Sequence, residues 1–278
     1  TIDVSAATFS GLVVGDAVTV SATGTFDNKN VGTGKTVTLS ETNAGDDVGN
    51  YTITDQGSTT ANITAKTLTA TASASNKVYD GTTTAAATLT FSGLVGSETL
   101  GQSVGATFAD QNVNTGISVT VNTITLSDGD NGGLATNYTI STGQTTTADI
   151  TAKTLTATAS ASNKVYDGTT TAAATLTFSG LVGSETLGQT VGATFADKDV
   201  ANAKTVTVNS ITLSDDGDSG GLADNYSIST GQTTTANITA KTLTATASAS
   251  NKVYDGNTTA TVTLTFTGLV GDETLGQT

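Results

Sequence analysis

The sequence KVYDG occurs at Lys77–Gly81, at Lys164–Gly168 and at Lys252–Gly256. These copies start at positions 77, 164 and 252, so they are spaced by 87 and 88 residues. Such a period is too long for one coil of a solenoid, but it matches the size of one small domain. The chain is therefore predicted to be a tandem array of small domains.

The repeats also define the predicted domain boundaries. Residues 65–151 and 152–239 form two complete repeats, which are almost identical over their first halves. Phe9–Val13 matches the middle of these repeats, so residues 1–64 are predicted to be a partial repeat. Residues 240–278 form a second partial repeat that starts like the complete ones. We interpret the chain as a segment of a longer protein.

Apolar residues and threonines alternate along most of each repeat. In the second complete repeat, Leu155, Ala157 and Ala159 share one face and threonines occupy the other. A period of two is typical of β-strands that bury a single face. No window shows a helical stripe. The repeats are therefore predicted to be all-β.

One strand changes its pattern along its length. Val206 and Val208 share a face, whereas Ile211 and Leu213 continue with the opposite parity. A single extra residue in one strand produces such a change of face. The sequence therefore predicts a β-bulge or a corner near residues 209–210.

The strand pattern indicates a fold class. One apolar and one threonine-rich face per strand indicates a sheet that is packed on one side. Two such sheets facing each other form a small immunoglobulin-like β-sandwich, with a β-grasp-like repeat as the alternative. Between repeats, Ile150–Leu155 passes from the last strand of one repeat to the first strand of the next, and no Gly, Pro or charged linker intervenes. We therefore expect tandem β-sandwich domains arranged as an end-to-end rod.

Composition excludes several functional classes. Ten lysines, no arginine and 24 acidic residues give a formal net charge of −14, so nucleic acid and anionic membranes are poor partners. The chain has no His, Cys, Met or Trp, and much of the usual catalytic repertoire is missing. The acidic clusters lie in Gly-rich turns, where little would bury them and raise a pKa. We therefore expect that this chain is not an enzyme and inserts into no membrane.

Two acidic turns, one in each complete repeat, hold the candidate metal ligands. Hard oxygen ligands on flexible loops suit calcium, although the glutamate that closes an EF-hand loop is missing. Asp and Gly also favour ordinary solvated turns, so both interpretations stay open. The calcium candidates are Asp128, Asp130, Asn131, Asp215, Asp216 and Asp218.

A second candidate chemistry is an internal isopeptide bond between a lysine and an asparagine. Lys66, Lys153 and Lys241 share strand parity with nearby leucines, which would point their stems inward. Asn225 and Asn237 lie on the closing strands of the second complete repeat. Lysine stems lying along a sheet edge would explain the same pattern.

The KVYDG motif itself has a structural interpretation. Asp167 and Gly168 form a turn sequence in which the glycine can adopt a positive φ angle. Tyr166 is expected to cover the end of the core and to form a hydrogen bond through its hydroxyl group.

KVYDGTT after an alternating KTLTATAS strand, followed by TFSGLVGSETL, resembles the YDG-type repeat of large bacterial surface adhesins, including those similar to filamentous haemagglutinin. The Gly24–Thr38 segment fits the same pattern, and the resemblance covers essentially the whole chain. It implies tandem all-β modules on a secreted or surface-anchored bacterial protein, and it supplies no catalytic or ligand residue. The first partial repeat departs most, because its Tyr-Asp-Gly segment would precede Thr1.

Two functional hypotheses follow. The leading one is a structural extender, or stalk, that projects an adhesive tip from the cell. Its partners would be neighbouring repeats, while other parts of the protein would contact host surface, matrix or other bacteria. The alternative is that the repeats themselves bind a host or matrix ligand, or sister rods, weakly and multivalently. No aromatic cluster or large apolar patch marks a binding hot spot.

Overall fold

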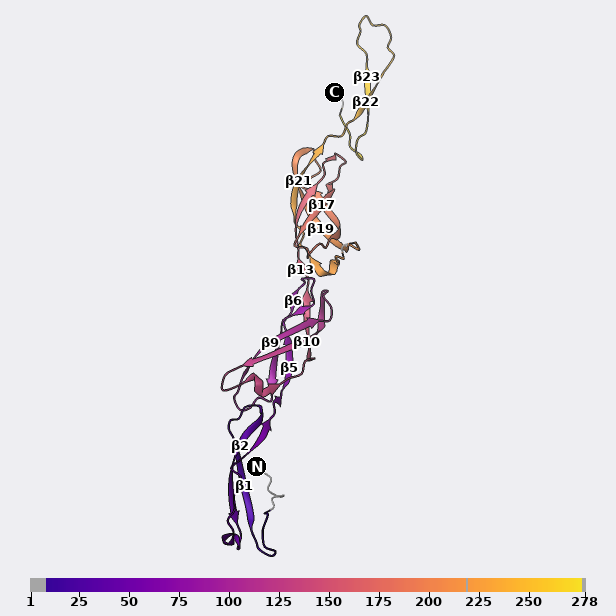
Figure 1. The fold of residues 1–278 in the computed structure, drawn as a ribbon. Helices are drawn as coiled ribbons and strands as arrows, with labels where there is room; N and C mark the ends of the chain where they lie inside the picture. The colour runs from indigo at the N-terminus through magenta and orange to yellow at the C-terminus, as the bar shows by residue number, and fades with distance from the viewer. Residues whose placement is uncertain (1–8, 219, 277–278) are drawn as a thin grey trace. The chain divides into compact units, whose positions relative to one another are not determined.

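The computed structural model describes residues 9–218 and 220–276, and it is built from β-strands (Figure 1). Within these residues the helical elements are three short 3-10 turns and no α-helix. No helix in the described part is long and apolar enough to cross a membrane. The predicted all-β class is confirmed.

The second complete repeat shows the architecture most fully. A five-stranded sheet has the order β15-β21-β19-β18-β16, β14 pairs with β17, and β13 pairs with β20 in parallel. The elements are β13 (Lys153–Thr154), β14 (Thr156–Ala161), β15 (Lys164–Val165), β16 (Thr171–Ala172), β17 (Ala174–Ser179), β18 (Leu187–Phe195), β19 (Ala201–Asp215), η3 (Ala223–Asn225), β20 (Tyr226–Ser227) and β21 (Thr233–Thr239).

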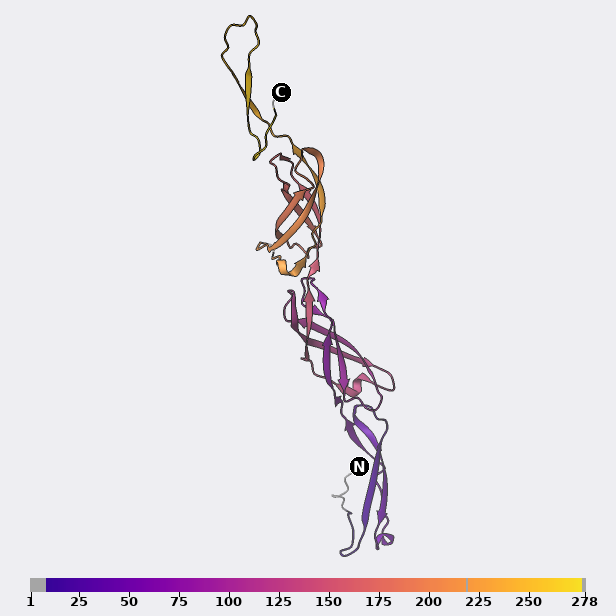
Figure 2. The same ribbon diagram turned by 180° about the vertical axis from the view of Figure 1, so that it is seen from behind.

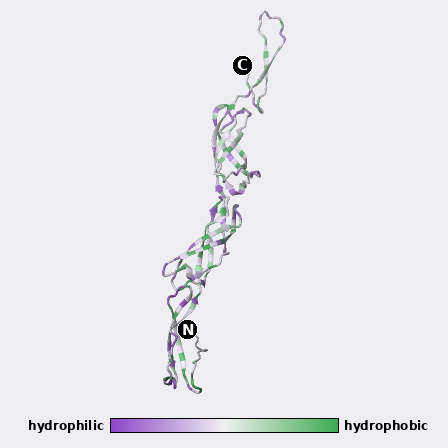
Figure 3. Ribbon diagram, in the orientation of Figure 1, coloured by the Kyte–Doolittle hydropathy of each residue, from purple (hydrophilic) through white to green (hydrophobic). Residues whose placement is uncertain are grey.

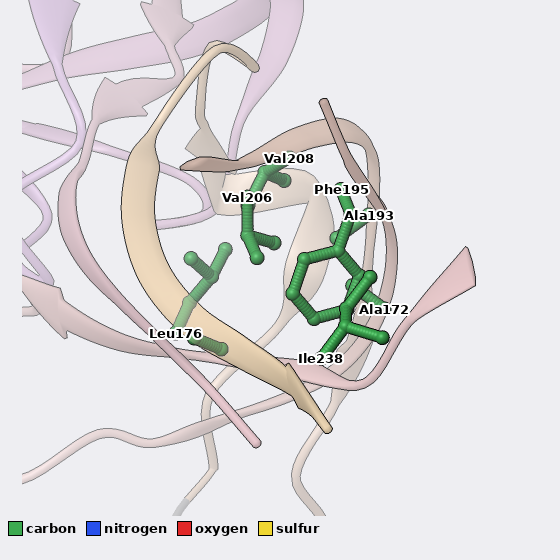
Figure 4. Close-up of a cluster of buried hydrophobic side chains, with 8 residues drawn as sticks. Ala172, Leu176, Ala193, Phe195, Val206, Val208 and Ile238 are labelled. Carbon is green, nitrogen blue, oxygen red and sulfur yellow. The ribbon is translucent and has the colours of Figure 1, made fainter. Parts of the chain in front are cut away.

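The two sheets of this repeat enclose a small core. Leu176 on β17 meets Phe195, Val206 and Ile238 from the five-stranded sheet (Figure 4). Val206 is 0% exposed and Ile238 is 1% exposed. Three alanines of β14 pack against the same cluster, which closes the second layer. The repeat is therefore a two-layer β-sandwich, as the alternating pattern predicts.

The predicted bulge lies in β19. The register between β18 and β19 shifts between Gly192 and Ala193, opposite Asn209. A Cβ at Gly192 would come within 2.3 Å of the Ser210 hydroxyl oxygen, so a larger residue there would require the Ser210 side chain to move. Beyond the bulge, Ile211 packs against the core cluster. The β-bulge that the change of parity predicts is therefore confirmed.

The first complete repeat has the same pairs of strands. β5 pairs with β8, β7 with β9, and β9 with β10, again with a register shift at Asn122. The elements are β4 (Lys66–Thr67), β5 (Thr69–Ala74), β6 (Lys77–Val78), β7 (Thr84–Ala85), β8 (Ala87–Ser92), β9 (Leu100–Phe108), β10 (Asn114–Asp128), η2 (Ala135–Asn137), β11 (Tyr138–Thr139) and β12 (Thr145–Thr151).

The partial repeats each hold part of this sandwich. The first has one sheet of order β1-β2-β3, without a register shift between β1 and β2. The last has a two-stranded sheet of β22 and β23, visible from both sides (Figures 1 and 2). Hydrophobic and hydrophilic residues are interspersed along the ribbon (Figure 3). The elements are β1 (Thr19–Phe26), β2 (Gly32–Ala44), η1 (Val48–Asn50), β3 (Ser58–Ile63), β22 (Thr244–Ala249) and β23 (Val262–Thr267).

Contacts divide the chain into two compact units that do not follow the sequence period. One unit contains residues up to 75 with 84–109 and 118–148, and the other contains 76–83, 110–117 and the chain from 149 onwards. Three segments of the first complete repeat therefore group with the repeat that follows: 76–83, which includes its KVYDG motif, 110–117 and 149–151. The domain boundaries inferred from the sequence remain predictions.

We expect Ile238→Ala to destabilise the chain by about 2–5 kcal/mol, because it leaves a cavity in a closed core. The equivalent change Ile63→Ala in the first partial repeat removes a half-buried side chain and should cost less. Urea denaturation followed by circular dichroism measures both. Equal losses of stability would contradict the difference in burial.

Candidate functional site: the joints between repeats

The KVYDG motif folds into a turn that is locked by its own side chains. The ammonium group of Lys77 donates hydrogen bonds to Asp80 at 2.7 Å and to the backbone oxygen of Thr82 at 2.6 Å. The same carboxylate oxygen of Asp80 accepts the backbone N–H of Thr82 at 2.9 Å. In the next repeat, Lys164 lowers the pKa of Asp167 to about 2 by the same hydrogen bond. The lysine and aspartate of the motif are therefore structural.

Two features of the structure explain the glycine of the motif. Gly81 and Gly168 adopt φ angles of 74° and 76°, which residues with a side chain rarely adopt. A Cβ at Gly81 would also lie 2.8 Å from a methyl carbon of Val182, which belongs to the following repeat. The turn thus brings successive repeats into contact. We call such a contact region between successive repeats a joint.

A single carboxylate holds the joint between the two complete repeats. The Tyr79 hydroxyl donates to one oxygen of Glu185 at 2.7 Å, and the Tyr226 hydroxyl donates to the other at 2.5 Å. The two tyrosine rings meet edge to face, with centroids 5.5 Å apart. Tyr79 is only 2% exposed. The predicted hydrogen bond of the motif tyrosine is therefore present, but it reaches the next repeat.

An asparagine forms the second connection of this joint. The Asn225 side-chain oxygen accepts the backbone N–H of Val113 at 2.8 Å, and its amide nitrogen donates to Asn112 at 3.0 Å. Asn225 is 1% exposed. It ends the η3 turn, whose first N–H, at Ala223, is held by the Asp215 carboxylate at 2.7 Å. A buried amide with both ends bonded fixes the position of the preceding repeat's loop.

The joint before the first complete repeat uses equivalent residues. Asn137 accepts the backbone N–H of Val31 at 2.9 Å. Glu98, the counterpart of Glu185, accepts the Tyr138 hydroxyl at 2.6 Å and the Lys29 ammonium group at 2.7 Å. Lys29 is the counterpart of Gln111 and Lys198, which stand in the same loop of the later repeats. The acidic residue and the asparagine therefore recur in both joints.

The joint after the second complete repeat combines both partners. Tyr166 donates its hydroxyl to Glu273, and Lys198 donates to the Tyr166 oxygen at 3.1 Å. The Lys198 ammonium also lies 5.4 Å from the centre of the tyrosine ring, within range of a cation–π interaction. The same acidic position therefore takes part in all three joints.

The surroundings of the joint tyrosines and of Glu98 shift their pKa values and so set their protonation states. Burial, followed by the hydrogen bond to Glu185, raises the pKa of Tyr226 to about 12 and raises the pKa of Tyr79 as well. The hydrogen bond from Lys29, followed by that from Tyr138, lowers the pKa of Glu98. At neutral pH the tyrosines are donors and Glu98 is an ionised acceptor.

The predicted calcium ligands are engaged with the protein itself. Asp128 accepts the backbone N–H of Ala135 at 2.8 Å, as Asp215 does for Ala223. These bonds hold the η2 and η3 turns that end in Asn137 and Asn225. The two carboxylates therefore position the asparagines of the joints.

The other acidic-turn residues also bond locally. Asn131 donates to the backbone oxygen of Ser97 at 2.9 Å, and the backbone N–H of Asp130 donates to a threonine hydroxyl. Asp216 accepts the backbone N–H of Asp218 and a hydroxyl group from Thr186. In the described residues no group of three or more acidic side chains is placed to hold a metal ion. Calcium binding by these turns remains a prediction.

The candidates for an isopeptide bond point elsewhere. Lys66 and Lys241 are exposed and Lys153 is half-buried, so the inward direction predicted for these stems is wrong for the first two. Lys66 and Lys153 begin the two-residue strands β4 and β13, where an ammonium group can stay in water. Asn237 accepts the backbone N–H of Ala203 at 2.7 Å. Its amide, like that of Asn225, serves a backbone group.

The sequence held a signal for the joint asparagine that its analysis missed. Asn-Tyr pairs stand at 50–51, 137–138 and 225–226, although the turns before them differ in length and composition. Glu98 and Glu185 lie in a stretch where the complete repeats are almost identical. Because almost every residue of this stretch recurs, recurrence does not single out the glutamate.

Replacing Asn225 by alanine should cost about 1–3 kcal/mol, because the N–H of Val113 and the amide of Asn112 lose buried partners. Asn50→Ala is the matched control, since Asn50 is exposed and its loss should change stability by less than about 0.5 kcal/mol. Hydrogen exchange of the Val113 amide, followed by NMR, reports the joint directly. Unchanged protection in Asn225→Ala would contradict the assignment.

The tyrosines predict a loss of stability in alkali. A tyrosine with a raised folded-state pKa stabilises the fold fully below its unfolded pKa of 10.0, and this contribution is lost as the pH rises towards about 12. Tyr226→Phe should remove that part of the pH dependence. Urea unfolding at a series of alkaline pH values, with tyrosinate absorbance, measures it. The same alkaline slope in wild type and variant would refute this role of Tyr226.

Comparison with known proteins supports the repeat organisation. The model of the YDG domain family matches residues 1–61, 64–148 and 151–236. Searches of curated proteins and of solved structures found no match. The three matches cover most of the chain in tandem and include the motif tyrosines and glycines of the complete repeats. The chain is thus a tandem array of YDG domains and belongs to the YDG domain family.

Proposed function

We propose that this chain is a structural extender, the stalk segment of a long bacterial surface adhesin that projects an adhesive tip from the cell. The observation that carries the proposal is the joint itself. Glu185 is shared by tyrosines of two successive repeats, and Asn225 is buried with both ends of its amide bonded. A spacer keeps its length only if its joints resist bending. Its functional residues are therefore those that fix one repeat to the next.

The connection between repeats leaves little slack. One residue, Ala152, separates the last strand of the first complete repeat from β13 of the next. β13 pairs at once with β20, so the new repeat begins within two residues of the old one. Bending at the joint would have to break bonds to Asn225 or expose an unpaired Glu185. Each such loss costs about 1–3 kcal/mol, which favours a stiff joint.

Charge supports the same proposal. A net charge of −14 keeps long chains soluble and makes parallel copies repel each other over the screening distance. We place the chain outside the cell, on the bacterial surface or secreted. Its partners would be the neighbouring repeats, and contact with host, matrix or other cells would occur through other parts of the protein. In this proposal the segment itself catalyses no reaction.

A second candidate function is weak multivalent binding by the repeats. Its support is a groove that accompanies two of the joints. A groove of about 230 Å³ is lined by Lys29, Val31 and Tyr138, and another of about 240 Å³ by Tyr166, Val200 and other residues. Repeated weak sites gain strength through avidity. Binding of the intact chain to immobilised glycans and matrix proteins would separate this candidate from a pure spacer.

Small-angle scattering of the chain tests the spacer function. At about 33 Å per domain, a stiff array of about three domains spans on the order of 100 Å. We expect this maximum dimension in excess EDTA and in millimolar calcium alike. The double variant Glu185→Ala, Asn225→Ala should broaden the distance distribution, whereas Asn50→Ala should not.

Two results would count against the proposal as stated. A compact particle in both solutions would refute the spacer. Extension only in calcium would show that the turns around Asp128 and Asp215 bind the ion. The stiffness of the array would then depend on calcium.

A further inference from the structure

The strands through which the chain enters and leaves a complete repeat pair in parallel. In the second complete repeat, β15 pairs with β21, with Lys164 opposite Ile238 and Val165 opposite Thr239. β15 follows β13 and β14 in the first segment of the repeat, and β21 is its last strand. Parallel strands cannot be joined by a tight turn, so the other strands of the repeat, β16 to β20, lie between these two in sequence.

This parallel direction decides how tension acts on the repeat. Tension along the chain pulls β15 towards its N-terminal end and β21 towards its C-terminal end. Because the two strands are parallel, these pulls are opposite and act along the strands. The hydrogen bonds between the strands run across them, so the bonds are sheared together. A hairpin that is pulled at its two ends would instead open one bond after another.

Backbone and side-chain hydrogen bonds connect the two strands. The Tyr166 N–H donates to the Thr239 backbone oxygen at 2.8 Å, and the Thr239 hydroxyl donates to the Lys164 backbone oxygen at 3.3 Å. Just before β15, the Asn163 side-chain oxygen accepts the backbone N–H of Asn237 at 2.7 Å. We call β15, β21 and the bond between Asn163 and Asn237 the clamp.

The motif lysine connects the clamp to the rest of the repeat. The Lys164 ammonium group donates to Asp167 at 2.7 Å. It also donates to the backbone oxygens of Thr169 at 2.8 Å and Thr171 at 3.0 Å, and it lies 5.6 Å from the centre of the Phe195 ring. Thr171 begins β16, which pairs with β18 in the five-stranded sheet. A pull on Lys164 is therefore shared with a second pair of strands.

The longer pairs that flank the clamp are loaded in the same direction. β14 directly precedes β15 and pairs with β17 along its whole length, and β21 pairs with β19. In both pairs, tension on the terminal strand again acts along the strand. Ile238 of β21 is 1% exposed and lies in the core cluster with Phe195 (Figure 4). Withdrawal of β21 would therefore also pull a buried side chain out of the core.

The first complete repeat has the same clamp. β6 pairs with β12 in parallel, and the Tyr79 N–H donates to the Thr151 backbone oxygen at 2.9 Å. The Asn76 side-chain oxygen accepts the backbone N–H of Asp149 at 2.7 Å. Asp149 stands where the second repeat has Asn237, and the bond is kept because its donor is a backbone group. The clamp is therefore a recurrent feature of the complete repeats.

We propose that each complete repeat is a force-resisting unit, in which the parallel clamp opposes tension along the chain. The KVYDG motif then has a second role beside the joint, because its lysine and valine form β15 and its tyrosine N–H closes the clamp. Forced unfolding is governed by the unfolding rate, which stays low when several bonds must break together. The inference deepens the proposed function and rests on it for the source of the load, since a stalk that holds an attached cell is pulled along its chain.

Pulling single molecules in two directions tests the clamp. The sequence has no cysteine, so two engineered cysteines fix the points at which force is applied to the full chain. Ala152→Cys with Ala240→Cys loads the clamp in shear. Thr156→Cys with Thr233→Cys pulls the strands apart from one end, at positions that are both exposed. Optical tweezers should show a several-fold higher unfolding force in the shear direction. The shear step should release a contour length on the order of 300 Å, at about 3.6 Å per residue.

Variants at the clamp distinguish it from general stability. Asn163→Ala removes the acceptor of the Asn237 N–H, and Lys164→Met removes the ammonium group but keeps the stem. Bonds loaded in shear share the force, so both variants should lower the shear force more than the force needed to pull the strands apart. Val165→Ala is the matched control, because Val165 is 55% exposed on the same strand, and it should change neither force. Circular dichroism confirms that each variant folds.

The inference fails if the two pulling directions give the same unfolding force. It also fails if a first step in shear is much shorter than a whole repeat, because the terminal strand would then leave before the core opens. Variants that lower both forces in proportion, or neither, would overturn the role of these residues in the clamp. A weak clamp in an extended array would leave the proposed spacer intact, whereas a strong clamp in a compact particle would overturn only the spacer.

Discussion

A carboxylate shared between two repeats is the constraint on which the rest of the structure depends. Glu185 has two oxygens, and each accepts a tyrosine hydroxyl from a different repeat. Removing either tyrosine would leave a polar group without its partner at the boundary, so the two repeats support each other's side chains. Most other features of the joint, including the turn of the KVYDG motif and the η3 turn, serve to bring these groups together.

The loop from the preceding repeat varies at one position that faces the joint. Lys29 and Lys198 stand at this position in two joints, where Lys29 binds Glu98 and Lys198 binds the Tyr166 hydroxyl. The joint between the complete repeats has Gln111 there. An exposed lysine contributes an ion pair that salt screens. Joints of one architecture can therefore differ in their sensitivity to salt along one chain.

Much of the fold followed from local pattern. The alternation around Leu155 and the change of parity after Val208 predicted the strands and the bulge, because each reports the burial of a single strand face. The joint was not predicted, because it depends on residues about 106–113 positions apart that no local period relates. The role of the acidic turns in the joint was not predicted for a similar reason. The sequence marks Asp128 and Asp215 as candidate calcium ligands, and the structure adds that their carboxylates accept the N–H groups of the turns beside them.

Every complete repeat carries both halves of a joint, the acid and asparagine at one end and the loop and KVYDG tyrosine at the other. A duplication or deletion of one whole period in the gene therefore joins two ends that already fit. The near-identity of residues 65–110 and 152–197 favours such recombination. The number of repeats is thus a quantity that selection can adjust in single steps, with no new contact to evolve, and related strains are expected to differ in the length of this array.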